Sequence, residues 1–251
     1  MVRPGKRLPL GACVEVGGEE AADRLEGEIV EVLSGRTRRI RFFQKEAWPK
    51  LLKRFGNTPL PPYIEAPEPN QFRERYQTIY AKHPGASAAP TAGMHFTESV
   101  FKALKKKGIE SVFVTLHAGL ATFQPVDVEH VEDHPIGVEP YHVTEEAFQQ
   151  IQRAKQEGRR IVAVGTTTVR VLETIALKGI GGLRGETKLF IYPGFQFKMV
   201  DGVITNFHLP RSTLLMLVSA FSGCERIQKA YATAIQEGYR FFSFGDATLI
   251  L

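Results

Sequence analysis

The first part of the chain, up to about residue 57, carries short runs of β-branched or alternating apolar and polar side chains, separated by Gly-rich or charged turns. Such runs predict strands. The predicted strands cover residues 12–16, 27–33 and 38–43. A helix at 46–55 follows, because its apolar residues recur at helical spacing. The proline-dense segment 58–69 is extended and marks a predicted boundary between a domain of residues 1–57 and one of residues 58–251.

After this boundary, helical periodicity alternates with short apolar runs, a pattern typical of α/β proteins. The predicted helices cover residues 96–107, 144–157, 165–178 and 225–237. The predicted strands cover residues 111–116, 160–164, 188–192, 203–207 and 239–244. This succession predicts a mostly parallel sheet or barrel, in which functional groups gather where strands lead into helices.

The stretch Val203–Phe221 combines a strand, a polar turn and an apolar helix. Alternation along the strand predicts that Asn206 and His208 share one face. Ser212 is a suitable N-cap for a helix that is apolar on nearly every side. Asn206 and His208 are therefore candidate site residues, although a capped turn in which they satisfy backbone groups is an equal alternative.

Several predicted strands end in compact polar turns, and parallel strands would bring these turns to one rim. The turns are 117–119, 165–168, 205–208 and 245–246. In the second of them, Gly165, Thr166 and Thr167 open a helix whose free amides and dipole suit an anion, with plain helix capping as the alternative. A cation at Arg170, in the first turn of this helix, predicts a carboxylate or phosphate partner. Asp246 is a candidate at the same rim.

Two further segments carry candidate chemistry. The small-residue segment 86–96, with Thr91 and Gly93, suits the close approach of a flat ligand and ends in His95; tight packing explains it nearly as well. The triplet 132–134 places acids beside a titratable imidazole, so that Asp133 could tune His134 as a general base, whereas a surface turn is the usual identity of such a triplet.

Composition bounds the class of protein. The 251 residues are 43% hydrophobic, and no apolar run is long enough to span a bilayer or to resemble a signal peptide. Two distant cysteines are expected in a reducing compartment, so the predicted location is the cytoplasm. Metal ligation is not predicted, because the histidines lie in separate segments without a spacing such as His-Glu-x-x-His.

The net charge of +5 is concentrated in residues 1–57, which hold 12 Lys and Arg against 8 Asp and Glu. Its densest part includes Arg38, Arg39 and Arg41, and alternation sends the last two to one side of the predicted strand. Contact with RNA phosphates is one interpretation. A solvated edge strand protected by charge is the other.

Together, the motifs resemble one family along nearly the whole chain and in order. They are Tyr76–Tyr80, Pro84–Ala86, Ala88–Phe96, Val114–His117, Val164–Thr167, Tyr192–Gly194, Thr205–Pro210 and Tyr239–Ala247. These strings resemble the S-adenosylmethionine:tRNA ribosyltransferase-isomerases of queuosine biosynthesis. The match begins within the family's β-barrel domain, so the resemblance implies that the chain lacks an N-terminal part.

The resemblance implies an α/β fold with a barrel-like catalytic domain and a smaller, here incomplete, antiparallel β-barrel domain. It also implies transfer and isomerisation of the ribosyl moiety of S-adenosylmethionine onto 7-aminomethyl-7-deazaguanine at the tRNA wobble position. The products would be epoxyqueuosine in tRNA, adenine and methionine. S-adenosylmethionine would be a co-substrate, and no metal or redox cofactor is expected. The expected partners are S-adenosylmethionine and tRNA. The protein is expected to be a monomer that does not associate with a membrane.

The implied chemistry begins with removal of a proton beside the sulfonium, which requires a base near neutrality. We expect His117 or His134 to be this base, with Asp133 and His208 in the catalytic group and His95 and Asn206 orienting substrate. The alternative function is a catalytically impaired fragment that retains tRNA or ligand binding. The family's usual glycine is Ala121 here, and a family histidine is Gly137.

Overall fold

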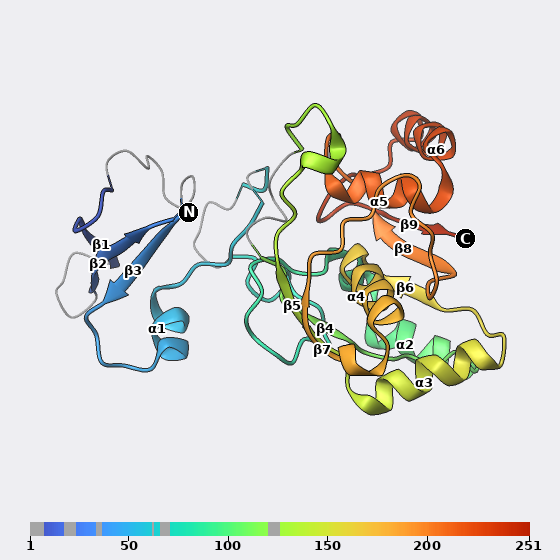
Figure 1. The fold of residues 1–251 in the computed structure, drawn as a ribbon, viewed down its shortest axis with the longest axis horizontal. Helices are drawn as coiled ribbons and strands as arrows, with labels where there is room; N and C mark the ends of the chain where they lie inside the picture. Colours follow the sequence, from blue (N-terminus) through green and yellow to red (C-terminus); the bar gives the residue numbers. More distant parts are fainter. Residues whose placement is uncertain (1–7, 18–23, 34–36, 62, 66–70, 120–125) are drawn as a thin grey trace. The chain divides into compact units, whose positions relative to one another are not determined.

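The structure is a computed structural model that describes residues 8–17, 24–33, 37–61, 63–65, 71–119 and 126–251. The chain divides into two compact units (Figure 1). One comprises Met1–Thr58 and Ala66–Gln71, and the other comprises Pro59–Glu65 and Phe72–Leu251. Each unit is described by itself below.

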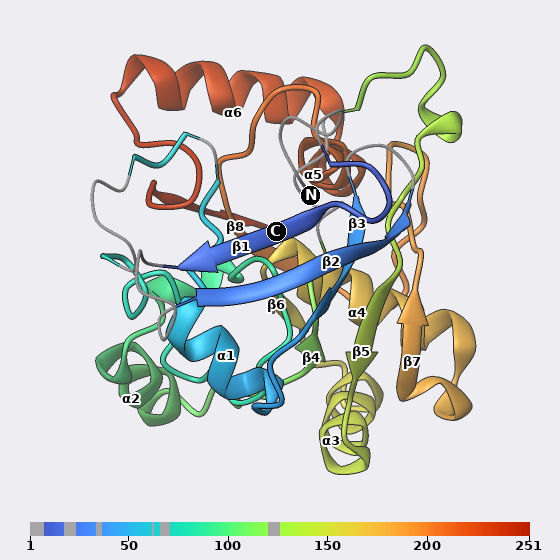
Figure 2. The same ribbon diagram turned by 90° about the vertical axis from the view of Figure 1, so that its left-hand side faces the viewer.

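The smaller unit holds an antiparallel sheet and one helix (Figure 2). Its strands are β1 (Cys13–Gly17), β2 (Arg24–Val32) and β3 (Arg38–Phe42), in that order across the sheet, and its helix is α1 (Trp48–Phe55). The three predicted strands and the predicted helix are therefore confirmed, with shifts of a few residues at their ends. Leu25, Ile29 and Leu51 are buried, and the rings of Phe42 and Trp48 stack at 5.4 Å between the last strand and the helix.

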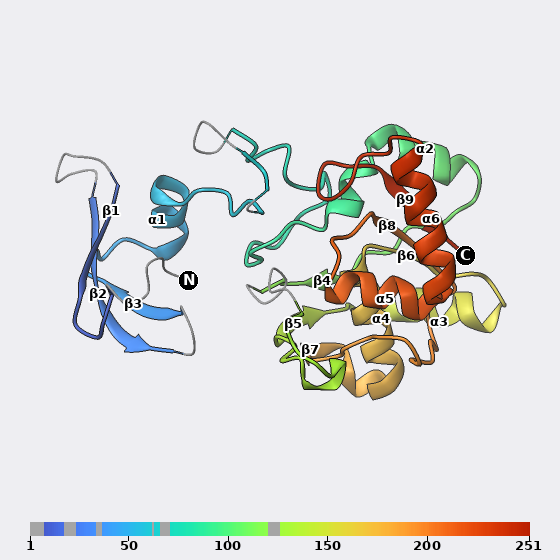
Figure 3. The ribbon, with the colours of Figure 1, turned by 90° about the horizontal axis from the view of Figure 1, so that it is seen from above.

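The larger unit holds two more three-stranded sheets (Figure 3). Their strands are β4 (Thr115–Leu116), β5 (Glu139–His142), β6 (Val162–Val164), β7 (Arg184–Thr187), β8 (Gly202–Asn206) and β9 (Ala247–Ile250). The helices are α2 (Glu98–Lys106), α3 (Glu145–Gln156), α4 (Thr166–Lys178), α5 (Thr213–Ser222) and α6 (Cys224–Gln236), with 3₁₀ turns η3 (Thr91–His95), η5 (Val131–Asp133) and η6 (Ile180–Gly182). The four predicted helices of this region are confirmed as α2, α3, α4 and α6.

Helix α4 lies between the two sheets of the larger unit. It contacts β4 and β7 of the β4-β5-β7 sheet and β6 and β8 of the β6-β8-β9 sheet (Figure 1). Its residues Val169, Val171 and Ile175 are at most 1% exposed and belong to one apolar core. Burial of such side chains contributes on the order of 2 kcal/mol each. The core therefore holds the start of this helix in a defined place, and its first turn lines the pocket described below.

The predicted mostly parallel sheet is wrong. Only β6 and β8 pair in parallel, and every other strand pair described is antiparallel. The described strands form three separate sheets and close no barrel, so the mixed α/β class is confirmed without the barrel. In the predicted strand 111–116 only Thr115–Leu116 pairs with a neighbour.

Two predicted strands are displaced. The strand expected at 188–192 forms instead at Arg184–Thr187, because this segment pairs with β5 whereas Ile191 packs into the core outside a ladder. No strand forms at 239–244, where Phe242 has φ +70°, which turns the backbone out of the extended region. The last strand begins at Ala247 after this turn.

The joint predicted at 203–221 is confirmed as β8, a turn and α5. The Ser212 hydroxyl caps the helix by accepting the Leu215 amide at 3.2 Å, and no residue of α5 is exposed. The strand ends at Asn206, so its alternation does not extend to His208, although both residues line the pocket described below. Among the residues described, every helix is too short or too polar to span a bilayer.

Candidate active site

A pocket of about 600 Å³ opens in the larger unit and is lined by segments far apart in the sequence. This volume lies within the roughly 300–1,000 Å³ of typical small-molecule sites. Its walls include residues 88–92, 165–167, 205–214 and 242–243. Three of the four predicted turns, those after 116, 164 and 204, thus contribute residues to one pocket. The last two follow β6 and β8, the parallel pair, whereas the first follows β4 of an antiparallel sheet.

Several of the predicted site residues line this pocket. They are Thr91, Gly165, Thr166, Thr167, Arg170, Asn206 and His208. The first turn of α4 presents Thr166 and Thr167 to the cavity, and its N-cap Gly165 has φ +90°, which side chains other than glycine rarely adopt. Helix N-termini offer unpaired amides and a partial positive charge to anionic groups.

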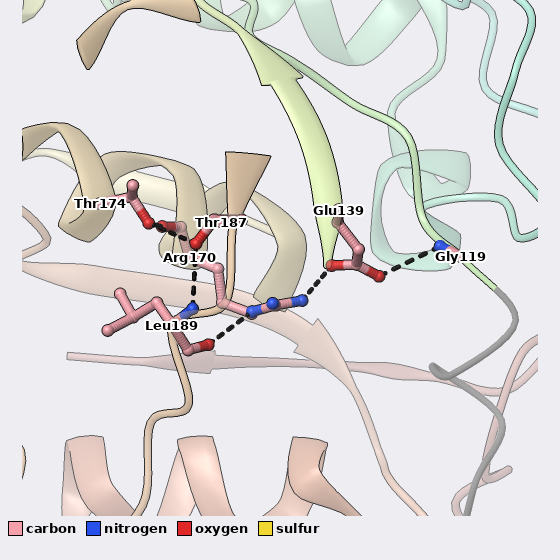
Figure 4. Close-up of polar contacts among 6 residues, drawn as sticks. All are labelled: Gly119, Glu139, Arg170, Thr174, Thr187 and Leu189. Carbon is pink, nitrogen blue, oxygen red and sulfur yellow. Dashed lines mark hydrogen bonds and ion pairs between the residues drawn. The ribbon is translucent and has the colours of Figure 1, made fainter. Parts of the chain in front are cut away.

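Arg170 lies at the centre of a polar network on one wall (Figure 4). Its Nη1 donates to Oε2 of Glu139, and its Nε donates to the Leu189 carbonyl at 2.9 Å. The side chains of Arg170 and Glu139 are 12% and 4% exposed, so the pair is almost fully desolvated. The predicted acidic partner of Arg170 is therefore Glu139, which comes from β5 and also accepts the Gly119 amide at 3.2 Å.

One nitrogen of the Arg170 side chain has no hydrogen-bond partner in this network. Nη2 of Arg170 is buried and has no hydrogen-bond partner within the part of the chain that the structure describes. Leaving a buried polar group unpaired costs on the order of 1–3 kcal/mol. Buried unpaired donors are uncommon in native proteins, so this one calls for an explanation.

Asn206, at the end of β8, forms hydrogen bonds with η3 and with the turn at 242–245. Its Oδ1 accepts the Thr91 hydroxyl at 3.2 Å, and its Nδ2 lies 3.4 Å from Nε2 of His95. Nδ2 also donates to the carbonyls of Phe242 and Gly245 at 3.1 and 3.3 Å. Asn206 is 2% exposed, and both its amide nitrogen and its amide oxygen are hydrogen-bonded to protein groups, one of which is the pocket residue Thr91.

His208 is buried beside the end of β8. Its Nε2 lies 2.9 Å from the Thr205 hydroxyl, and its backbone amide donates to the Tyr231 hydroxyl at 2.9 Å. Burial lowers the pKa of His208 from its ordinary value of 6.5 to about 4. The imidazole is therefore neutral at physiological pH.

The other histidine candidates lie outside the pocket lining. His117 is half-buried against Gly85, where an added Cβ would come within 2.8 Å of its Nδ1; the adjacent Ala118 does line the pocket. His134 is 8% exposed, and its ring lies 5.7 Å from that of Phe190, which lines the pocket. Asp133, at the end of η5, is exposed.

Two other predicted site positions, Gly93 and Asp246, have structural partners. Gly93 lies under Tyr80, whose hydroxyl would meet an added Cβ at 2.0 Å, so packing alone requires a glycine here. Asp246 closes a turn by accepting the Arg240 amide at 2.8 Å and its Nη2 at 2.7 Å. The hydrogen bonds from the Arg240 side chain are the largest cause that holds the pKa of Asp246 below its usual range.

The arginines of β3 lie in the smaller unit. Arg39 and Arg41 are exposed on one side of the strand, as predicted, and pair across it with Glu31 and Glu28. Arg38 donates through Nε to the Leu8 carbonyl at 2.8 Å. Within the described segments, no cluster of three His, Cys, Asp or Glu side chains could hold a metal ion.

Sequence reasoning missed several pocket residues. They are Glu139, Tyr63, Tyr76, Phe242 and Ser243. Most of them fall inside or next to the strings that carry the family resemblance, which was the available signal. Tyr63 lies in the proline-rich segment treated as a linker, where no pattern marks it.

Comparison with known proteins agrees with this arrangement. A family model described as queuosine biosynthesis protein matches residues 1–250. The S-adenosylmethionine:tRNA ribosyltransferase-isomerases of Desulfitobacterium hafniense and Heliobacterium modesticaldum are 51% and 52% identical, with 100% of this chain and 72% and 73% of the relatives covered. A crystal structure of S-adenosylmethionine tRNA ribosyltransferase from Thermotoga maritima is 36% identical with a TM-score of 0.53, covering 100% of this chain and 69% of that one. The chain therefore belongs to the queuosine biosynthesis protein family, which comprises enzymes named S-adenosylmethionine:tRNA ribosyltransferase-isomerase.

Proposed function

We propose that this enzyme transfers and isomerises the ribosyl moiety of S-adenosylmethionine onto 7-aminomethyl-7-deazaguanine in the tRNA wobble position. Epoxyqueuosine in tRNA, adenine and methionine are the products. Family membership and a pocket large enough for a nucleoside-sized ligand support this function. The reaction as proposed needs no metal or redox cofactor, and the protein acts as a monomer in the cytoplasm.

The observation that carries the proposal is the unpaired Nη2 of Arg170 in the pocket wall next to the first turn of α4. Glu139 balances the charge of the guanidinium, so the ligand is not required as its counter-ion. The two N–H groups of Nη2 and the amides at Thr166 and Thr167 are donors that suit the carboxylate of the methionine moiety. The residues 88–92 form the small-residue wall for the adenine, with Gly93 behind it.

The general base is His117 or His134 in this proposal, and Asp133 tunes the latter. His208 has a different role, because a pKa of about 4 makes it a poor base at neutral pH. It contributes a neutral hydrogen-bonding group to the wall of the pocket. His95 and Asn206 orient substrate through Thr91, and Asp246 supports His95 from its turn, where its charge interacts with that imidazole.

The tRNA is held in part by Arg38, Arg39 and Arg41. The exposed guanidinium groups of Arg39 and Arg41 exchange their cross-strand carboxylates for phosphates. Such exchange costs little, because exposed ion pairs contribute only about 0–1 kcal/mol.

Incubation of the 251-residue chain with S-adenosylmethionine and tRNA that bears the precursor base tests the function, with adenine release as the readout. We expect adenine only when both substrates are present. Equal release with unmodified tRNA would contradict the proposed acceptor. Binding of both substrates without any adenine release would favour the alternative, a catalytically impaired fragment.

A further inference from the structure

Three hydroxyl groups meet in a part of the pocket wall to which no role has been assigned. The Ser243 hydroxyl lies 2.7 Å from that of Tyr63 and 3.5 Å from that of Tyr76. All three residues line the pocket, and Tyr76 and Ser243 are only 4% and 7% exposed. They come from segments about 170 residues apart in the chain, so tertiary folding alone assembles the group.

The three hydroxyls have more hydrogen-bonding capacity than they use on one another. Each can donate one hydrogen bond and accept two. Two contacts within the group occupy at most two of the three protons, so one proton and several lone pairs remain for other partners. Burial raises the pKa of Tyr76 above its ordinary value of 10.0, so its hydroxyl is a donor at physiological pH, as in an exposed tyrosine.

The same wall contains aromatic rings. The ring of Tyr63 lies 5.2 Å from that of Phe242, and the ring of Tyr76 meets that of Phe244 edge-on at 5.7 Å. Tyr63, Tyr76 and Phe242 all line the cavity. Aromatic side chains are the usual stacking surface for a flat heterocycle, and stacking is tolerant of which base it receives.

The backbone that carries Ser243 is strained and firmly held. Phe242 has φ +70°, which for a bulky residue costs on the order of 1–3 kcal/mol. Its amide donates to the Phe207 carbonyl at 3.1 Å, and its own carbonyl accepts the side chain of Asn206 at 3.1 Å. Strain of this kind persists where surrounding contacts impose it and is concentrated at ligand sites.

We infer that Tyr63, Tyr76 and Ser243 form a subsite for a planar nitrogen heterocycle whose edge carries both donors and acceptors. A hydroxyl can donate a hydrogen bond to an acceptor on the edge of the heterocycle or accept one from a donor there. The aromatic rings pack against the face of the heterocycle. The inference rests on the proposed function, which supplies two such bases: the adenine of S-adenosylmethionine and the 7-deazaguanine of the tRNA. Both share this chemistry, and the experiment separates them.

The test measures binding by calorimetry, with adenine, 7-aminomethyl-7-deazaguanine, S-adenosylmethionine and precursor-bearing tRNA as probes. The variants are Tyr76→Phe and Ser243→Ala. The matched control is Tyr239→Phe, which removes the same hydroxyl from an exposed residue outside the pocket lining. We expect about tenfold weaker binding of one base and of the substrate that contains it in both variants, and no change in the control.

Weaker binding of adenine and S-adenosylmethionine would assign the subsite to the leaving base, and weaker binding of the deazaguanine and tRNA would assign it to the acceptor base. Unchanged binding of every probe in both variants, or no binding of either base to the wild-type chain, would overturn the inference. Thermal unfolding of each variant checks that it folds. Because binding is measured without turnover, a base-binding subsite in a chain that releases no adenine would refute the proposed function alone.

Discussion

Helix α4 carries two charged side chains within one turn, Arg170 and Glu173, and they differ in whether their hydrogen bonds are complete. Glu173 is fully buried, and its carboxylate accepts the backbone amides of Lys198, Met199 and Val200 at 2.9–3.0 Å. Arg170 lines the pocket and retains an unpaired Nη2. A buried charge whose partners are complete serves the fold, whereas a buried charge with a spare donor beside a cavity is available to a ligand.

The largest effect is expected from Glu173→Ala. It removes the acceptor of three buried amides, so the free energy of unfolding should fall by about 3 kcal/mol. Urea unfolding measures the change, with Glu237→Gln on the exposed end of α6 as the control. A loss of less than about 1 kcal/mol would show that the carboxylate is not the structural group that the comparison requires.

Arg170→Lys should affect turnover more than stability. A lysine keeps the charge beside Glu139 but lacks the fork of donors that reaches both Leu189 and a ligand. We expect kcat/KM for adenine release to fall by about tenfold to a hundredfold. If Arg170→Lys lost as much stability as Glu173→Ala and left kcat/KM unchanged, Arg170 would serve the fold in the same way as Glu173, and the contrast between the two residues would be wrong.

His208 is a third buried polar group with protein partners, and its pKa makes it testable by pH. The folded pKa of about 4 lies below the ordinary 6.5, so between these values only the unfolded chain binds the proton. The contribution of His208 to the free energy of unfolding is therefore complete above pH 6.5. It is lost as the pH falls toward 4 and does not change further below pH 4. At pH 5 the loss is about 2 kcal/mol.

The measurement for this group is urea unfolding between pH 7 and 4.5 for the wild type and for His208→Asn, which cannot titrate. The variant should show a flatter decline of stability with falling pH. Parallel declines in the two proteins would mean that the folded state leaves His208 free to bind a proton.

The smallest effect on stability is expected from the exposed pairs of β3. Replacing Arg39 and Arg41 together by Gln should change the free energy of unfolding by less than about 1 kcal/mol. If these side chains contact tRNA, the slope of log K against log salt should decrease by about one for each arginine. An unchanged slope would mean that Arg39 and Arg41 do not contact the tRNA and serve only as charges on a solvated edge strand.

Much of the local structure could be predicted because local interactions decide it. Ser212 caps its helix as its position suggested, and Thr97 and Thr144 cap the helices predicted at 96–107 and 144–157, since each hydroxyl accepts an amide three residues ahead. The strand expected at 239–244 could not be predicted correctly, because a left-handed Phe242 depends on hydrogen bonds to Phe207 and Asn206.

In the candidate site, too, some features follow from the sequence alone and others depend on the tertiary structure. The sequence by itself determined the helix that begins at Thr166, the need of Arg170 for an acidic partner, and the family strings around the pocket. Only the tertiary structure decided that this partner is Glu139, that Asn206 is hydrogen-bonded to protein groups on both sides of its amide, and that the hydroxyls of Tyr63 and Ser243 are in contact. Local periodicity and capping act within one or two turns of chain, whereas burial, hydrogen-bond saturation and pKa depend on groups that meet only after folding.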